Sequence, residues 1–278
     1  MKELFDQVSL RCSRITTNAY STSFSLGIKM LHKKLHDPIY SIYGFVRFSD
    51  EIVDTLHDYD KKQLLKSFTK DTYQAIEEKI SLNPILQSFQ LAVNQYNIDH
   101  QLIDAFLHSM ELDLEQNSYD KKGYDEYIYG SAEVVGLMCL QVFCEGDSKQ
   151  YESLKNSARS LGSAFQKINF LRDFNDDYHG MGRLYFPNIR MDNFNETVKK
   201  EIEADILNDF KLGFQGIKKL PKGAKLGVYV AYVYYLSLYK KVTRKTASEL
   251  LNARIRVSNL RKLSLLFGAF IRHRLNLI

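Results

Sequence analysis

Two stripes of polar side chains interrupt helical segments that are otherwise apolar. The first stripe runs at steps of four, three and four residues through the segment 38–57 and consists of Tyr43, Arg47, Asp50 and Asp54. At this spacing the four side chains project from one helix face. Carboxylates one turn apart repel each other and are costly to bury, so an interior face that carries them needs a cation such as Mg²⁺. Taken alone, the stripe is better explained as a solvated face on which Arg47 is an ion-pair partner.

The second stripe lies in the segment 148–178, at steps of three, four and four residues: Gln166, Asn169, Asp173 and Asp177. Amides and carboxylates left unpaired on an apolar helix would each cost about 1–3 kcal/mol. Two helices of this kind can face one another across a cavity, where their four aspartates would converge. Such a site suits two or three Mg²⁺ ions that hold a diphosphate and neutralise it as a leaving group. A site of this kind is what the ionisation of an allylic diphosphate requires.

The elements that must position these stripes are helices. Apolar residues recur at three and four along almost every long segment, and no alternating strand pattern stands out, so the predicted class is all-α. The expected helices span 2–13, 38–57, 61–80, 85–97, 99–116, 124–144, 148–178, 196–219, 223–245 and 247–274. Four of them are apolar around most of their circumference and should form a central bundle: 38–57, 124–144, 148–178 and 223–245. Short connections without a linker or an internal repeat predict a single domain over 1–278.

Composition narrows the class further. With 45% hydrophobic and 26% charged residues, 14 Gly and 4 Pro, the 278-residue chain is neither disordered nor collagen-like. Its three cysteines have no metal-ligand spacing and predict neither a disulfide framework nor a zinc site. The N-terminus carries no secretory signal pattern, and the longest uncharged apolar run, 226–239, is shorter than the ~20 residues of a membrane span. We therefore expect a cytoplasmic protein that is not integral to a membrane.

Positive charge is concentrated towards the C-terminus. The net charge of +5 is too small to indicate nucleic-acid binding, but 240–274 holds ten Lys and Arg against one acid, Glu249. This basic segment is explained by a solvated helix surface, by a clamp for phosphate groups, or by peripheral contact with the inner face of an anionic membrane. The cations expected to face such a membrane are Arg261, Lys262, Arg272 and Arg274.

Both stripes lie in longer motifs that resemble the two aspartate-rich signatures of the squalene and phytoene synthases. The first motif reads YGFVRFSDEIVD from Tyr43 to Asp54, and the second runs from Gln166 to Pro187 and ends in GRLYFP. The resemblance covers nearly the whole chain and is carried further by Ser21-Thr22-Ser23-Phe24, by Tyr127 to Gly136, by Tyr235 to Leu238, and by Arg254-Ile255-Arg256.

Membership of this family implies the isoprenoid-synthase all-α fold, a single helical domain with a central active-site cavity. It implies Mg²⁺ dependence, with Mn²⁺ as a substitute, and head-to-head condensation of two prenyl diphosphates through a cyclopropylcarbinyl diphosphate. The expected reaction joins two geranylgeranyl diphosphates into phytoene, a step of carotenoid biosynthesis, in a monomer or weak dimer. Alternatives are dehydrosqualene or squalene formation from farnesyl diphosphate, another terpenoid synthase chemistry, and a non-catalytic scaffold of the same fold.

The resemblance also implies roles for individual residues. The implied metal ligands are Asp50, Asp54, Asn169, Asp173 and Asp177. The implied diphosphate contacts are Ser21, Ser23, Arg47 and Arg254. The residues implied to line the reaction cavity are Tyr43, Tyr129, Gln166 and Asn169.

Several positions depart from the family pattern or stay open. Glu51 stands where many relatives have an aspartate, Thr22 where some have a lysine, and Glu133 where a glycine is common. Asp113 is expected either to join the metal ligands or to form a structural salt bridge. The loop 179–187 is expected to close over bound diphosphate, with Arg183 holding the closed form.

Overall fold

The computed structural model describes residues 1–116, 118–176, 182–187, 189, 193–251, 255 and 257–278. Across these residues the chain is helical and contains no strand; one isolated bridge pairs Ser118 with Leu184. This confirms the all-α class.

The helices of the N-terminal half are α1 (Lys2–Tyr20), α2 (Thr22–Lys29), α3 (His36–Asp54), α4 (Lys61–Glu78), α5 (Pro84–Tyr96) and α6 (His100–Glu115), with a 3₁₀ turn η1 (Lys33–Leu35) between α2 and α3. The rest of the chain forms α7 (Lys121–Ile128), a π-helical segment η2 (Tyr129–Glu133), α8 (Val134–Cys144), α9 (Ser148–Asp176), α10 (Glu196–Lys219), α11 (Lys222–Val242), α12 (Ala247–Leu250) and α13 (Asn259–Arg274).

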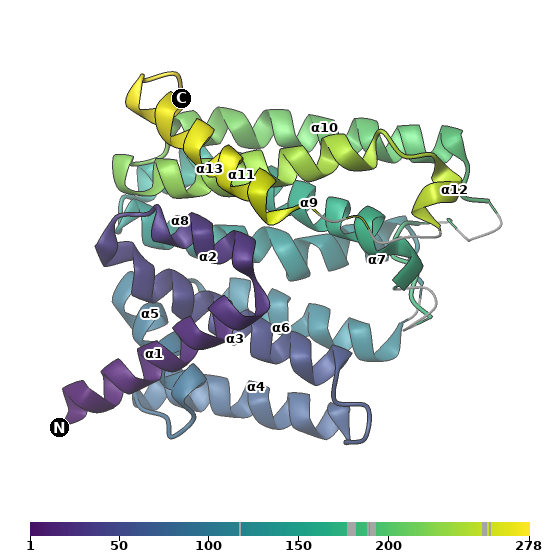
Figure 1. Ribbon diagram of the computed structural model, residues 1–278. Coiled ribbons are helices and arrows are strands. Elements are labelled where there is room, and N and C mark those ends of the chain that lie inside the picture. The colour runs from purple at the N-terminus through teal and green to yellow at the C-terminus, as the bar shows by residue number, and fades with distance from the viewer. Residues whose placement is uncertain (117, 177–181, 188, 190–192, 252–254, 256) are drawn as a thin grey trace.

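These helices gather into two groups. In Figure 1, α1 and α3–α6 lie on one side of the molecule, and α9–α11 with α13 lie on the other. Helix α8 belongs to the interior and packs on α9, α3 and α6. Its side chains are buried around nearly the whole circumference, as the apolar pattern of 124–144 predicted.

Local sequence signals set the starts of several helices. Asp60 and Asp99 accept hydrogen bonds from backbone N–H groups of the first turns of α4 and α6. Asn83 caps α5 in the same way, and Pro84 follows at the first helical position, where its missing N–H costs nothing. The predicted bounds of these helices therefore agree with the structure to within a few residues.

Helix α1 is longer than predicted, and the cause is the chemistry of its buried face. That face carries the hydroxyls of Ser9, Ser13 and Thr17 instead of apolar side chains, so hydrophobic periodicity ends too early. The hydroxyl of Thr17 bonds to the Ser13 carbonyl at 2.9 Å, which satisfies it within the helix. A Cβ on Gly44 of α3 would lie 2.6 Å from the Ser13 Oγ, so small residues on both helices permit their close approach.

The prediction of one helix over 247–274 is wrong. Helix α12 ends at Leu250, and Val257 and Ser258 are not helical. The chain begins a new helix, α13, where Ser258 Oγ accepts a hydrogen bond from the Arg261 N–H. A serine cap competes with helix continuation, because its side chain replaces a backbone acceptor.

Within the described part of the chain, one helical stretch, Lys121–Cys144, is long and apolar enough to cross a membrane by length and composition alone. Its apolar window is 67% buried inside the molecule. Core helices pass the same composition test, so this stretch is weak evidence for a membrane span. The apolar run 226–239 lies within α11, which is packed against α2, α10 and α13.

Candidate active site

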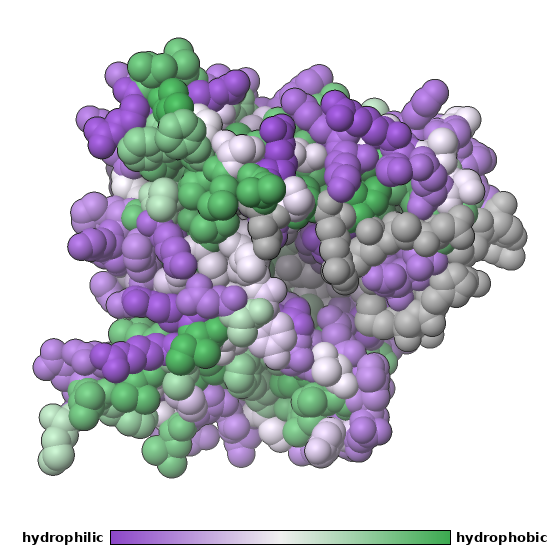
Figure 2. All heavy atoms as spheres, in the orientation of Figure 1, coloured by the Kyte–Doolittle hydropathy of each residue, from purple (hydrophilic) through white to green (hydrophobic). Residues whose placement is uncertain are grey.

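A cavity of about 720 Å³ lies among α2, α3, α8, α9 and α11. Figure 2 shows that the face of the molecule presented there is hollowed near its centre. The predicted residues that line the cavity are Ser21, Ser23, Tyr43, Arg47, Asp50, Asp54, Gln166, Asn169 and Asp173. The structure therefore brings the described members of both polar stripes to one cavity, which one stripe alone could not indicate.

The first stripe places a destabilised carboxylate in the cavity wall. Loss of hydration, together with the nearby charge of Asp54, raises the pKa of Asp50 to about 8, although Arg47 opposes the shift. Arg47 lies 3.9 Å from Asp50 but makes its close ion pair with Glu51. Asp50 is thus a half-buried carboxylate whose negative charge the chain itself compensates poorly.

Arg47 is fixed from several sides. Its ion pair with Glu51 holds the guanidinium in place, so Glu51, which departs from the family pattern, has a positioning role. The guanidinium also lies 4.3 Å from the ring centroid of Tyr20. The buried Nε of Arg47 has no hydrogen-bond partner in the described part of the chain. A donor held in this way at the wall of a cavity is prepared for an anionic ligand.

The second stripe offers a buried hydrogen-bond acceptor that, like the Arg47 Nε, has no partner among the described residues. Asn169 bonds through its side chain to Tyr235, yet its buried Oδ1 accepts no hydrogen bond from any described residue. Asp173, one turn further, is held by the neighbouring Arg172, whose Nε donates to Oδ1 at 2.8 Å. Tyr235 and Tyr43 both contact the ring of Phe24, at 5.7 and 4.6 Å between centroids, which ties the two stripes together.

The side-chain oxygens of the two stripes are of the chemical types that bind Mg²⁺. Carboxylate and amide oxygens are the protein ligands that this ion takes, together with water and phosphate oxygens. Within the described residues no three acidic, histidine or cysteine side chains surround one point. Asp177 lies outside the described residues, so the predicted four-aspartate set is represented by Asp50, Asp54 and Asp173.

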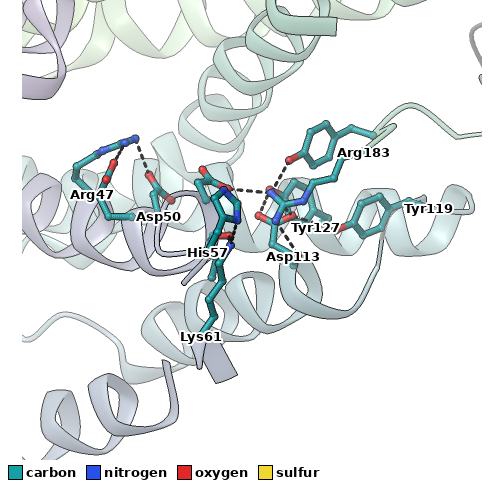
Figure 3. A network of polar contacts seen from close by, with 12 residues as sticks. Arg47, Asp50, His57, Lys61, Asp113, Tyr119, Tyr127 and Arg183 are labelled. Carbon is teal, nitrogen blue, oxygen red and sulfur yellow. Dashed lines mark hydrogen bonds and ion pairs between the residues drawn. The ribbon is translucent and has the colours of Figure 1, made fainter. Parts of the chain in front are cut away.

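A buried arginine links the first stripe to the loop after α9 (Figure 3). Arg183 donates to Asp54 Oδ1 at 2.9 Å and to the backbone carbonyl of Asp113 at 2.8 Å, and its side chain is 7% exposed. Burial raises the pKa of Asp113 to about 6, although Arg183, 3.8 Å from its Oδ1, lowers it. Tyr127 donates to the other oxygen of Asp113 at 2.7 Å.

This network decides between the two interpretations of Asp113. Its carboxylate is engaged by Arg183, Tyr127 and Tyr119, so the salt-bridge interpretation describes the structure. Arg183 contacts a predicted metal ligand from the loop that was expected to close. Of that loop, 179–181 lies outside the described residues, and its closure stays a prediction.

One residue given a role by resemblance, Tyr129, lies elsewhere than expected. Tyr129 does not line the cavity; the guanidinium of Arg159 lies 5.2 Å from its ring centroid, and Arg159 also pairs with Glu133 at 2.6 Å. Tyr127 lines the cavity instead. The π-helical segment begins at Tyr129 and adds a residue to the helical turn, which shifts the faces presented on either side of it.

The C-terminal cations divide differently from the prediction. Lys262 was expected to face a membrane, but it lines the cavity, where its Nζ donates to Thr22 Oγ1 at 2.7 Å and lies 5.3 Å from the Tyr234 ring centroid. Thr22 is the position at which some relatives have a lysine, so α13 supplies an ammonium group beside it. Arg254, expected to point inward, lies outside the described residues.

Comparison with known proteins identifies the family. A model described as squalene/phytoene synthase matches residues 17–261. The chain is 29% identical over 197 residues, 68% of its length, to the 4,4'-diapophytoene synthase of Staphylococcus haemolyticus (strain JCSC1435). It is 29% identical over 216 residues, 71% of its length, to the phytoene synthase of Arthrospira platensis. These matches span 66% and 65% of the relatives' own lengths, about two thirds of each.

Solved structures show the same fold. A dehydrosqualene synthase crystallised with a ligand superposes with a TM-score of 0.82 at 20% identity. The superposition covers 97% of this chain and 98% of that one. The helices described above therefore form the isoprenoid-synthase fold.

Proposed function

Because the chain belongs to the squalene/phytoene synthase family, we propose that it joins two molecules of geranylgeranyl diphosphate head to head into phytoene and releases two diphosphates. Its relatives include a phytoene synthase and a diapophytoene synthase. Family membership thus supports prenyl diphosphates as substrates.

The polar end of the cavity supports diphosphate binding. Arg47 and Lys262 supply positive charge from two different helices, and the hydroxyls of Ser21 and Ser23 lie on the same wall. Ser21 Oγ also accepts the Phe24 N–H at 3.2 Å and so fixes the start of α2. Charge-assisted hydrogen bonds from such groups orient a phosphate and lower the cost of its negative charge.

Mg²⁺, which we propose is held by Asp50 and Asp54 on one side and by Asn169 and Asp173 on the other, would neutralise the departing diphosphate. The residues themselves bind and orient the ester so that its allylic carbon points into the apolar part of the cavity. Asp177 completes this proposed ligand set by its place in the motif.

The apolar part of the cavity suits a carbocation. Phe165 stacks on Tyr235 at 4.1 Å between centroids, and Phe24 contacts both rings. Their π faces stabilise positive charge, and the closely packed rings exclude water that would quench it. Burial raises the pKa of Tyr235 to about 12, so its phenol stays protonated and neutral at physiological pH.

The length of the cavity is the observation that favours geranylgeranyl chains. Its lining extends along α3 from Asp54 to Ile39, ~22 Å at 1.5 Å per residue, and along α9 from Asp173 to Leu154, ~28 Å. A geranylgeranyl chain has one isoprene unit more than a farnesyl chain and needs a correspondingly longer cavity. A lining of this length leaves room for the longer chain, and this supports the proposed substrate.

Ala158 offers a direct test of this assignment. It lines the cavity fifteen residues before Asp173, ~22 Å along α9. We expect Ala158→Phe to lower kcat/KM for geranylgeranyl diphosphate at least about tenfold, ~1.4 kcal/mol, and to change that for farnesyl diphosphate by less than threefold. Product analysis with each substrate measures this, with Ala158→Ser as the control of matched size. The chain-length proposal would be contradicted if the wild-type protein, supplied with both farnesyl and geranylgeranyl diphosphate, made mainly the thirty-carbon product.

Lys262 gives a second test, of the diphosphate site. Replacing it with Gln should raise KM for the prenyl diphosphate about tenfold, because one charge-assisted contact is lost. The decrease in kcat should be smaller than this tenfold change in KM. Arg261→Gln is the matched control, because this neighbour is exposed and does not line the cavity. Equal KM values for Lys262→Gln and wild type would remove Lys262 from the site.

A further inference from the structure

We infer that α13 is a docking helix that lays its outward face on an anionic phospholipid bilayer and thereby places the cavity mouth beside the membrane. The inference rests on the side chains of α13 and on its position. It does not require the proposed chemistry.

The outward face of α13 is apolar. Leu260, Leu263, Phe267, Phe270 and Ile271 recur at helical spacing, and their exposed fractions are 83, 56, 67, 40 and 40%. Leu275 and Leu277 continue the exposed surface past the helix end at 63 and 65%. Figure 2 shows hydrophobic side chains gathered over the C-terminal part of the chain. Water-exposed apolar side chains on one face of one helix mark an interaction surface.

The inward face of the same helix is occupied. Leu266 and Ala269 pack against the hydrophobic core, where α13 packs on α11, and Ala269 is 2% exposed. Arg272 is near the Tyr229 hydroxyl at 3.4 Å. The outward apolar stripe is thus additional to the face that holds α13 in the fold.

Charge selects a lipid surface as the occupant. From 250 to 278 the sequence contains six Lys and Arg and no Asp or Glu. Arg261 and Arg274 are exposed beside the apolar stripe, as in helices that lie in the plane of an anionic leaflet. A second copy docked through the same face would bring like charges together, so we assign the surface to the membrane.

The position of α13 connects this surface to the cavity. Lys262, near the start of the helix, bonds to Thr22 at the cavity wall, and its neighbours Leu260 and Leu263 point outward. A helix that rests on the bilayer therefore holds the cavity mouth within a few side chains of the lipid. A long-chain ligand could pass between the two with little exposure to water.

Sedimentation with vesicles tests the docking surface. Wild-type protein should bind vesicles of equal parts phosphatidylcholine and phosphatidylglycerol. Leu263→Gln/Phe267→Gln/Ile271→Gln should lower the partition constant about tenfold or more, because apolar burial is lost. The matched control, Leu4→Gln/Val8→Gln/Ile15→Gln, changes equally exposed apolar residues of α1 and should bind like wild type.

Variants that remove positive charges separate the electrostatic contribution to vesicle binding from the apolar one. Arg261→Gln/Arg274→Gln should weaken binding to the anionic vesicles by roughly fivefold for each charge and leave the weaker binding to pure phosphatidylcholine unchanged. Lys66→Gln/Lys70→Gln on the exposed face of α4 is the control. Circular dichroism and thermal melting of each variant establish that it is folded.

Three results would overturn the inference. One is a wild-type protein that does not sediment with anionic vesicles. Another is a folded apolar triple variant of α13 that binds them as wild type does. The third is a lipid-free dimer, seen by sedimentation velocity, that only this triple variant abolishes, which would assign the face to a second copy of the chain.

Discussion

Asp50→Asn is expected to fold and to lose turnover by a factor of about a hundred or more, ~2.7 kcal/mol of barrier. The substitution keeps the side-chain volume and removes a charge that faces the cavity, and Asp173→Asn should behave in the same way. Turnover is measured with geranylgeranyl diphosphate and Mg²⁺. Asp71→Asn, at an exposed position on α4, is the control that should retain wild-type rate.

A second readout separates metal binding from catalysis. Mg²⁺ with inorganic diphosphate should raise the melting temperature of the wild type, because a ligand that binds only the native state stabilises it. The shift should be much smaller in Asp50→Asn and Asp173→Asn. Either variant with more than a tenth of wild-type turnover and an unchanged shift would contradict the proposed ligand set.

Asp50→Asn should also change the stability of the metal-free protein. Burial raises the pKa of Asp50 to about 8, so the folded state binds this proton more tightly than the unfolded state does. The charged form becomes a growing penalty as pH rises from about 4 to 8. In the presence of a chelator, Asp50→Asn should therefore be at least as stable as wild type at pH 8, and the difference should shrink towards pH 4.

Arg183→Gln is expected to destabilise the fold by about 3 kcal/mol, the cost of leaving one partner of a buried ion pair without the other. Arg183 and Asp113 are both nearly buried, and the arginine also holds Asp54. Urea unfolding measures the loss. Arg14→Gln breaks an exposed pair with Asp37 and should cost less than about 1 kcal/mol.

The destabilisation by Arg183→Gln should depend on pH. The pKa of Asp113 is raised to about 6 even with Arg183 present to lower it, so it rises further when Arg183 is removed. At pH 5 the carboxyl is largely protonated and tolerates the loss, whereas at pH 8 the variant must either bury an unpaired charge or take up a proton. The gap between variant and wild type should therefore widen from pH 5 to pH 8.

A double variant tests whether the two groups act as a pair. Arg183→Gln/Asp113→Asn should be more stable at pH 8 than Arg183→Gln alone, because the uncompensated carboxylate is removed. Purely additive losses in the two single variants would show that Arg183 acts through its other contacts.

The sequence alone determined the helical class and the two stripes of the candidate site. Both follow from spacing within one helix, since residues three and four apart share a face whatever surrounds the helix. The bounds of α10 were predicted to the residue at 196–219 for the same reason. The resemblance added the family, which the comparisons confirm.

Tertiary structure decided which cations serve the cavity. Spacing places Arg261 and Lys262 side by side, but only the packing of α13 on α11 directs Lys262 to Thr22 and leaves Arg261 exposed. Helix α13 begins separately, after a break that follows the end of α12 at Leu250. Periodicity could not reveal the break, because the apolar pattern continues on both sides of it.

The same physics explains why Tyr127 and Arg183 were missed as partners of Asp113. They come from α7 and from the loop after α9, and they meet Asp113 of α6 only in the folded chain. Local spacing fixes which side chains share a helix face, because it depends on backbone geometry alone. Which buried charges meet depends on how the helices pack, because the cost of leaving a charge unpaired is set by its surroundings in the folded state.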